Sequence, residues 1–492
     1  MDPRIPIWTQ TLGAGLQALA PEGMLVLALL LTLALAALPP RFRAAAPWAL
    51  WACTAAGIAW LLGHWPPADA APLWAGMARS DAASAYARLL ILAALAVAAF
   101  LYRSSAQMSP ETSALLATLA LGAMLLSQAS HLLMLYLSLE LSSLPAYLLT
   151  ARRRRRRDAA EASVKYALFG AFASGMMVYG ISWLYGITGS LEPADPEFVR
   201  RLSEAPPALL AAPVLLLLSG LLFKAGAAPM HFWAPDAYQG APLPVAALFS
   251  IAPKAGAMLA LMRLLDGWEG AASLPLVRGL LGAAALLSMT LGNFAALGQT
   301  DVRRLLAYSG IAHAGYMLLG VLTGALSGRV SVGLYLGAYL LMNLGAFAWA
   351  ARARQLSGSF RITAWQGLAR SHPLLAAGFT VCLVSLAGLP PTGGFIAKWY
   401  VFLALVEQIR LSWDSFLLLL LVAGVLNTLI SFIYYLRIPA QMVFREAPPE
   451  GWKPARGTGL AAAGTALAAL SLLSGMAGFD TLLGALAAWL WN

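Results

Sequence analysis

The chain has 492 residues, of which 60% are hydrophobic and only 11% are charged, and its mean hydropathy is +0.74. No soluble domain of this length is so apolar, so this composition excludes a soluble globular protein. The net charge of +11 would suit a nucleic-acid-binding protein, but the positions of the charges argue against that class. Runs of about 20 apolar residues between short polar loops instead indicate membrane-spanning helices.

The hydropathy pattern predicts an all-α polytopic membrane protein with about 14 transmembrane helices. The predicted spans, in chain order, are residues 22–38, 47–63, 83–102, 112–128, 131–149, 162–186, 207–228, 242–265, 273–297, 304–326, 331–351, 372–409, 414–436 and 458–476. The twelfth of these is predicted to be broken, because paired prolines and glycines interrupt it.

The basic residues are distributed unequally between the two sides of the membrane. If alternate loops are assigned to opposite sides, with the basic run Arg152–Arg157 inside, the inner loops hold 19 Lys and Arg and the outer side holds nine. This bias predicts that both termini lie on the outer side. The basic run is then most simply a topology anchor near anionic headgroups.

The four remaining basic residues are all lysines inside predicted helices: Lys165, Lys224, Lys254 and Lys398. The chain has only five lysines in total, so its loops use arginine and its membrane interior uses lysine. Arginine stays protonated in proteins, whereas a desolvated lysine can release its proton. This division favours a proton-handling path over an accidental placement of one lysine.

The sequence predicts no redox cofactor or metal on this chain. Cys53 and Cys382 lie in separate apolar helices, and no iron–sulfur or haem spacing is present. The stretch GTGLAA from Gly457 fits a loose dinucleotide fingerprint, but no strand precedes it and a membrane helix follows, so we interpret it as chance.

Two interrupted helices suggest an internal duplication. The first contains KAGAAPMHFWAP (224–235) and the second AGLPPTGGFIAKWY (387–400), and each is the fourth helix of a group of five. Broken helices in inverted repeats point to a translocation site near the bilayer midplane. The predicted regions are an N-terminal three-helix region at 1–111, two inverted five-helix repeats at 112–265 and 266–438, and a C-terminal helix region at 439–492.

Glu140 is an acid well inside an apolar run, on a helix face that also carries Tyr136, Ser143 and Tyr147. Its expected partner is Lys224, at the end of a half-helix where unsatisfied carbonyls favour a cation. Intramembrane acids and bases are functional by default. The alternative is a buried pair that only holds two helices together.

Three further residues complete the candidate set. Lys254 lies half-way along its helix, where snorkelling is difficult, and Lys398 follows the second break as Lys224 precedes the first. His313 shares a helix face with Ser309 and could relay protons, although a hydrogen-bonded core histidine is an equal alternative. Lys165, four residues after Glu161, is also well explained as an ordinary surface pair.

Four stretches resemble the antiporter-like membrane subunits of respiratory complex I, and most closely the N-type subunits of the bacterial enzyme. They are FKAGAAPMHFWAPDAYQGAP, LFSIAPKAGAM, RRLLAYSGIAHAGYMLLG and SLAGLPPTGGFIAKWYVF. The resemblance covers roughly the fourth to the thirteenth predicted helix. It implies 14 helices, two inverted repeats, and breaks in the seventh and twelfth helices.

By this resemblance, Glu140 corresponds to the glutamate of helix five and Lys224 to the lysine of helix seven. Lys165, Lys254 and Lys398 correspond to lysines of helices six, eight and twelve. The M-type sister subunits usually have a glutamate where Lys398 stands. The resemblance also implies that NADH, FMN, iron–sulfur clusters and quinone belong to partner subunits, with K-type and M-type subunits as membrane neighbours.

Three functional hypotheses follow. The first is a proton-translocating subunit of NADH:quinone oxidoreductase in the bacterial inner membrane, in which an ion pair between Glu140 and Lys224 forms and breaks. Protons and internal water would be its cargo, with a path through Lys254 and His313 to Lys398 and the outer side. The second is a subunit of an Mrp-type cation/proton antiporter, and the third is a structural membrane scaffold with static lysine pairs.

Overall fold

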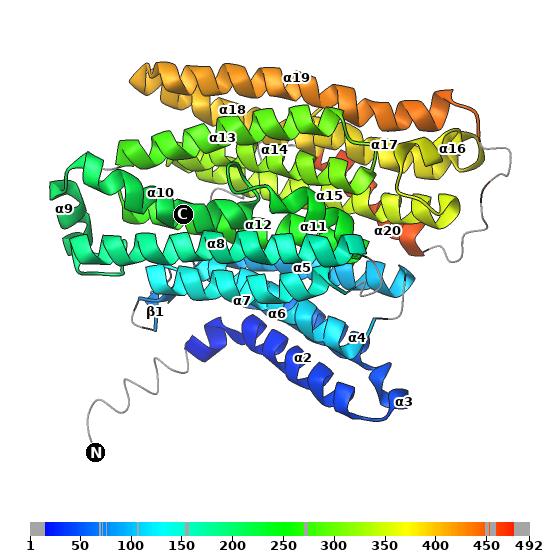
Figure 1. Ribbon diagram of the computed structural model, residues 1–492, viewed down its shortest axis with the longest axis horizontal. Helices are drawn as coiled ribbons and strands as arrows, with labels where there is room; N and C mark the ends of the chain where they lie inside the picture. The colour runs from blue at the N-terminus through cyan, green and yellow to red at the C-terminus, as the bar shows by residue number, and fades with distance from the viewer. Residues whose placement is uncertain are drawn as a thin grey trace.

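The computed structural model describes residues 15–67, 70, 72–74, 76–105, 108–152, 157–269, 274–447, 452 and 459–476. In these residues the long helices lie side by side in one bundle, with α2 at one edge and α19 at the opposite edge (Figure 1). The described part contains one two-stranded antiparallel sheet, in which Pro72 pairs with Arg79 and Leu73 with Ala78.

The N-terminal region comprises α2 (Ala20–Ala37), α3 (Pro40–Arg43), α4 (Ala46–Gly63), β1 (Pro72–Leu73), β2 (Ala78–Arg79) and α5 (Ala82–Ser105). The first group then comprises α6 (Pro110–Gln128), α7 (Leu132–Thr150), α8 (Arg157–Thr188), α9 (Pro196–Glu204), α10 (Pro207–Ala225), α11 (Trp233–Gly240) and α12 (Leu243–Gly267).

The second group comprises α13 (Leu274–Leu297), α14 (Val302–Thr323), α15 (Leu326–Ser357), the 3-10 helix η1 (Ile362–Trp365), α16 (Leu368–Ser371), α17 (Pro373–Ala387), α18 (Gly393–Ser412) and α19 (Ser415–Phe444). The last described helix is α20 (Gly459–Met476).

The all-α membrane architecture is confirmed, and each predicted span falls on a helix of the structure. Among the described residues, 12 helices are long and apolar enough to cross a membrane, and the apolar helices α17 and α20 are shorter. The number of crossings and the inverted relation of the two groups stay predictions.

Both predicted breaks are present, after α10 in the first group and after α17 in the second. Helix α10 ends before Gly226, whose φ of 66° is left-handed, and α17 ends before Gly388, whose φ is 85°. The bonds Ala228–Pro229 and Pro390–Pro391 are cis.

Backbone groups freed at a break inside a membrane must find partners within the protein. At the first break, the Ala228 amide donates to Ser288 Oγ of α13 at 2.8 Å. At the second, the Gly394 amide donates to Ser385 Oγ of α17 at 3.2 Å. The first break therefore depends on a side chain from the second group of helices.

Helix α12 lies at the centre of the bundle. It packs against α5 of the N-terminal region, α6 and α10 of the first group, and α14 and α15 of the second. Its membrane-spanning segment is buried inside the protein throughout. A helix apolar on all sides suits this position, because no face of it meets solvent. Lys254, near its middle, is consequently far from the membrane surfaces.

The structure also contains a buried ion pair that sequence reasoning missed. Glu22 in the first turn of α2 is 4% exposed, and Arg88 of α5 is 1% exposed. Arg88 Nη1 lies 3.4 Å from Glu22 Oε2, and Gln128 of α6 donates to Glu22 Oε1 at 2.7 Å. Arg88 also donates to Ser80 Oγ at 2.8 Å. This cluster joins the N-terminal helices to the first group.

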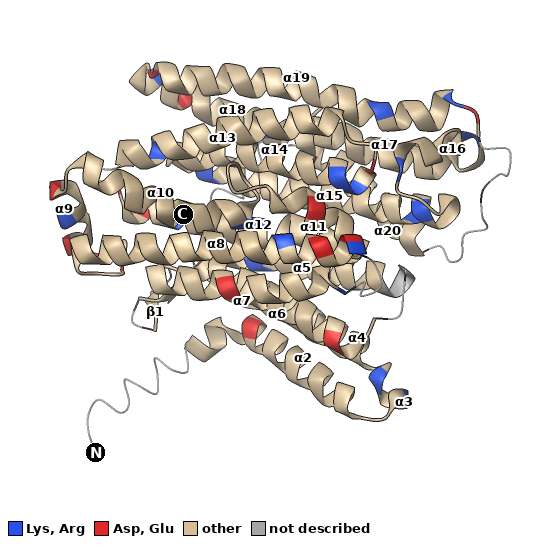
Figure 2. Ribbon diagram, viewed as in Figure 1, with Lys and Arg blue, Asp and Glu red and all other residues tan. Residues whose placement is uncertain are grey.

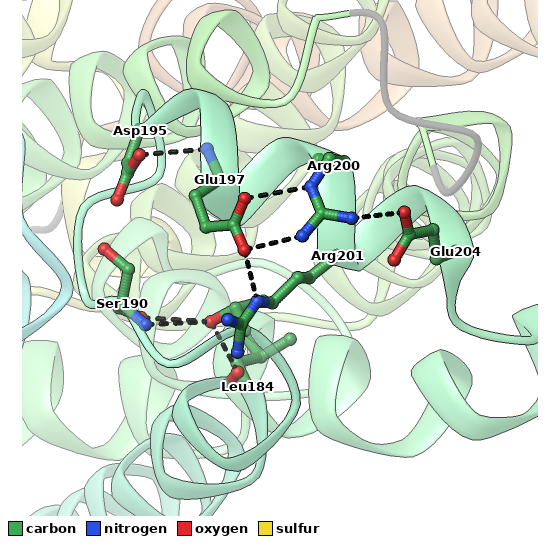
Figure 3. Close-up of polar contacts among 8 residues, drawn as sticks. Leu184, Ser190, Asp195, Glu197, Arg200, Arg201 and Glu204 are labelled. Carbon is green, nitrogen blue, oxygen red and sulfur yellow. Dashed lines mark hydrogen bonds and ion pairs between the residues drawn. The ribbon is translucent and has the colours of Figure 1, made fainter.

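Helix α9 is a short surface helix stabilised by its own ion pairs (Figure 3). Asp195 caps its first turn by accepting from the Glu197 amide at 2.9 Å. Glu197 pairs with both Arg200 and Arg201, at 2.7 and 2.6 Å. Hydrogen bonds from these two guanidinium groups lower the pKa of Glu197 to about 2.

Basic residues lie on the short helix α3 and residues of both charges on α9, and further charged residues lie on the long helices (Figure 2). Helix α3 contributes Arg41 and Arg43 to the side assigned as inner. Residues 153–156 of the predicted basic anchor lie outside the described residues. The orientation of the chain in the membrane stays a prediction.

The buried pair predicts how the N-terminal region responds to substitution. Arg88→Met leaves the Glu22 carboxylate buried without its cation, so we expect it to destabilise the protein by about 3–5 kcal/mol. The double variant Glu22→Gln with Arg88→Met removes both charges, and we expect it to recover most of that stability. Thermal unfolding of the detergent-solubilised protein measures both.

Arg200→Ala on α9 is the control, since its ion pairs are exposed and screened by solvent, so we expect little change in stability. Equal destabilisation by the single and the double variant would show that the two buried charges are not coupled.

Candidate functional site

Lys224 lies in the last turn of α10, just before the first break, and is 2% exposed. Its Nζ is buried without a hydrogen-bond partner in the protein, and Glu140 Oε1 of α7 is likewise buried and unpartnered. The charge of Glu140 acts on Lys224. The two residues are thus electrostatic neighbours but not a contact ion pair.

The contact pair expected between Glu140 and Lys224 is therefore absent, and so is the expected capping of the α10 carbonyls by Lys224. Helix α8 packs against both α7 and α10, and these two helices make little contact with each other. Glu140 is only half-buried, at the margin of a face that exposes Leu137 and Leu144. Their separation follows from how α7 and α10 are placed around α8, which hydropathy does not specify.

An aromatic cluster occupies the space beside Lys224. Tyr166 stacks on Trp233 with ring centroids 4.2 Å apart, and it also contacts Tyr147 and Phe223 at 4.8 and 5.8 Å. Trp233 Nε1 donates to the Phe223 carbonyl at 3.1 Å across the break. These contacts hold α11 against the end of α10.

Lys254 of α12 is 3% exposed. Its Nζ donates to the Gly310 carbonyl of α14 at 2.5 Å and lies 5.6 Å from the Tyr339 ring centroid. A Cβ at Gly310 would lie 3.9 Å from this Nζ and 3.1 Å from Tyr339 Oη. The small residue on α14 therefore leaves room for the Tyr339 hydroxyl beside the ammonium.

His313 of α14 is 2% exposed. It lies three residues after Gly310, whose carbonyl binds Lys254, and three before Tyr316, whose ring lies under Lys398. Its Nδ1 lies 2.8 Å from Tyr335 Oη of α15, and its Nε2 lies 3.2 Å from Tyr435 Oη of α19. The structure thus brings the predicted histidine between two predicted lysines. No sequence signal pointed to the two tyrosines, which come from the next helix, α15, and from α19.

Lys398 of α18 is 4% exposed and reaches back to the end of the preceding half-helix. Its Nζ donates to the Ala387 carbonyl, the last residue of α17, at 2.8 Å, and lies 4.7 Å from the Tyr316 ring centroid. The negative end of a helix dipole favours a cation at this place. A Cβ at Gly388 would lie 2.8 Å from Lys398 Cδ.

Lys165 is separated from the buried lysines, because its side chain is 45% exposed. It pairs with Glu161 at 2.6 Å and with Asp236 of α11 at 3.2 Å, and Asp236 also binds Arg304 at 2.6 Å. These groups line a cavity of about 210 Å³ with Asp158, Gln239 and Gly240. The sequence did not indicate that Asp236 and Arg304 meet here.

His231 lies inside the first break and is 6% exposed, with Nδ1 unpartnered in the protein. Within the part of the chain that the structure describes, no group of three or more His, Cys, Asp or Glu could hold a metal ion. The free thiols Cys53 and Cys382 are buried on different helices.

The model of the family described as NADH:quinone oxidoreductase/Mrp antiporter, TM, matches residues 129–431. The chain belongs to this family. NADH-quinone oxidoreductase subunit N of Anaeromyxobacter sp. is 37% identical over 422 residues, which cover 80% of this chain and 81% of the relative. Subunit N 2 of Sorangium cellulosum is 41% identical over 342 residues, or 67% and 66% of the two chains.

Solved structures share the fold of this chain. A chain of respiratory complex I from Thermus thermophilus, with bound aureothin, has a TM-score of 0.77 at 36% identity and covers 95% of this chain and 99% of its own. A chain of the Mrp complex from Dietzia sp. has a TM-score of 0.78 at 22% identity, covering 97% of each chain. The resemblance stated from the sequence motifs is confirmed.

The geometry at the second break predicts a large effect of one methyl group. Gly388→Ala puts a Cβ against Lys398 at a left-handed φ, which costs about 1–2 kcal/mol before any clash. We expect a lower unfolding temperature for the solubilised protein. Gly175→Ala on α8 is the control, because nothing lies within 4 Å of its added Cβ and alanine favours helix by about 1 kcal/mol. Equal stability of both variants would contradict the crowding at Gly388.

Proposed function

We propose that this chain is the N-type membrane subunit of a bacterial NADH:quinone oxidoreductase and that it translocates protons through its buried lysines. The observation that supports this most directly is the position of His313 on α14, between Gly310, whose carbonyl binds Lys254, and Tyr316, whose ring lies under the Lys398 ammonium. Ionisable groups buried at membrane depth mark ion and proton paths. A bundle of helices that served only as a scaffold would not require buried ionisable groups.

In this proposal the polar cavity at Lys165 and Asp236 is the inner mouth of the path. From there the proton passes the aromatic cluster around Trp233 to Lys224, and then Lys254, His313 and Lys398. Each buried lysine can hold a proton and release it, whereas the arginines of the loops cannot. Water in the breaks would carry the proton over gaps that side chains do not span.

Proton transport by Glu140 and Lys224 would need two states, one with the residues apart and one with them paired. The structure corresponds to the first of these states. Closing the pair to about 4 Å, at an effective dielectric constant near 20, adds ~4 kcal/mol of attraction. Moving one charge through ~150 mV requires ~3.5 kcal/mol, at ~2.3 kcal/mol per 100 mV. Opening and closing this pair is therefore comparable in energy with transporting one proton against a membrane potential.

The energy for transport comes, in this proposal, from electron transfer in partner subunits that carry FMN and iron–sulfur clusters and act on NADH and quinone. The membrane neighbours would be K-type and M-type subunits in the inner membrane, with both termini of this chain on the outer side. The inverted repeats would be residues 112–265 and 266–438, between an N-terminal region at 1–111 and a C-terminal region at 439–492.

An Mrp-type antiporter subunit is the second candidate, because the family model covers both kinds of protein. The complex I chain of Thermus thermophilus is 36% identical to this chain, whereas the Mrp chain is 22% identical and supports the fold alone. This difference in identity favours the complex I subunit.

Lys224→Met tests the proposed function, since it removes the charge and keeps most of the volume. In inverted membrane vesicles holding the assembled complex, we expect NADH-driven proton uptake to fall by at least about tenfold, together with quinone reduction, because the two are coupled. Assembly is checked on a native gel. Normal proton uptake by an assembled variant would refute the proposal.

Leu221→Ala, one turn earlier on α10 and fully buried, is the matched control. It weakens packing by about 2–5 kcal/mol but leaves the lysine in place. If Leu221→Ala and Lys224→Met reduce assembly alike and leave turnover per complex unchanged, Lys224 has a structural role and the scaffold hypothesis is preferred.

A further inference from the structure

His313 has a tyrosine hydroxyl on each of its two ring nitrogens, which no part of the proposed path yet uses. Tyr335 Oη lies 2.8 Å from Nδ1 and Tyr435 Oη lies 3.2 Å from Nε2. Both tyrosines are fully buried. They come from α15 and α19, so the arrangement is assembled from three helices.

A neutral imidazole donates from one nitrogen and accepts at the other, and a hydroxyl can do both. One of the two tyrosines must therefore donate to His313 while the other accepts from it. When the imidazole takes a proton at one nitrogen and releases one from the other, it ends in the opposite tautomer. Two rotatable hydroxyls can serve both tautomers without movement of the helices.

The two tyrosines have different neighbours, each of which adjoins a contact of one lysine. Tyr435 also shares a hydrogen bond with Ser309, which adjoins Gly310, the acceptor of Lys254. Tyr335 stacks on the ring of Tyr316 with centroids 6.5 Å apart. The ammonium of Lys398 lies over that same Tyr316 ring, at 4.7 Å from its centroid. Tyr435 is thus on the Lys254 side of His313, and Tyr335 on the Lys398 side.

A third buried tyrosine packs its ring against that of Tyr435, with centroids 4.3 Å apart, but its hydroxyl donates to a different partner. Tyr434, the residue before Tyr435, donates to Asn293 Oδ1 at 2.9 Å, and Asn293 donates to Asn427 Oδ1 at 3.2 Å. A side-chain amide accepts or donates a hydrogen bond but does not pass a proton on. This branch therefore ends at Asn293.

We propose that Tyr435 and Tyr335 are proton-relay residues that carry the proton into and out of His313. The inference rests on the proposed function. Tyr435 gives its hydroxyl proton to Nε2 and takes a replacement from Ser309 Oγ, its other hydrogen-bond partner, while water passes a proton from the Lys254 ammonium to Ser309. Nδ1 gives its proton to Tyr335, whose own proton passes toward neutral Lys398. Each hydroxyl gains one proton as it loses one, so the net change is one proton moved between the lysines and an imidazole in the opposite tautomer, which must revert before the next proton passes.

The test compares Tyr435→Phe with Tyr434→Phe in the assembled complex. Each variant removes one buried, hydrogen-bonded hydroxyl from the same turn of α19, so we expect similar unfolding temperatures. NADH-driven proton uptake in vesicles should fall by at least about tenfold in Tyr435→Phe and stay within about twofold in Tyr434→Phe. The solvent deuterium isotope effect on turnover should rise only in Tyr435→Phe, because proton transfer becomes rate-limiting there.

If Tyr435→Phe fails to assemble, Tyr335→Phe provides a second test. It removes the hydroxyl that contacts the other ring nitrogen of His313, and we expect the same fall in proton uptake. Normal uptake by either assembled relay variant would overturn the inference, and so would equal losses in the 434 and 435 variants. If Lys224→Met abolishes uptake while both relay variants are normal, the proposed function stands and this inference alone fails.

Discussion

A charge inside a bilayer must be enclosed by protein, and the arrangement of this molecule follows from that requirement. Lys224, Lys254 and Lys398 are 2%, 3% and 4% exposed, so each is shielded from lipid on all sides. Enclosing them takes several layers of helices around α12, which packs against all three regions of the chain. The apolar outer helices cover this centre and can meet lipid or apolar neighbours.

The two broken helices meet the same requirement for backbone groups. Each break exposes amides and carbonyls that lipid cannot satisfy. At the first break a serine of α13 accepts the Ala228 amide, and at the second Lys398 itself donates to the Ala387 carbonyl. The second break is thus stabilised by the group that would carry the proton. Loss of a proton from Lys398 would therefore also change its hydrogen bond to the Ala387 carbonyl at the end of α17.

The polar groups of the centre are connected by contacts between distant helices. His313 contacts Tyr335 and Tyr435, from α15 and α19. The cluster of Glu22, Arg88 and Gln128 joins α2, α5 and α6 in the same way. Buried polar clusters of this kind favour one arrangement of the helices, because any other leaves a polar atom without a partner.

The sequence alone determined the membrane class, the spans, both breaks and the lysines Lys224, Lys254 and Lys398. Each of these is a local property: hydropathy over about 20 residues, or proline and glycine within one helix. Only the tertiary structure showed that Glu140 and Lys224 are not in contact, that Lys165 is exposed, and that tyrosines flank His313. The reason is physical. Which side chains meet depends on the rotation and tilt of each helix, and these are set by packing against neighbours rather than by hydropathy.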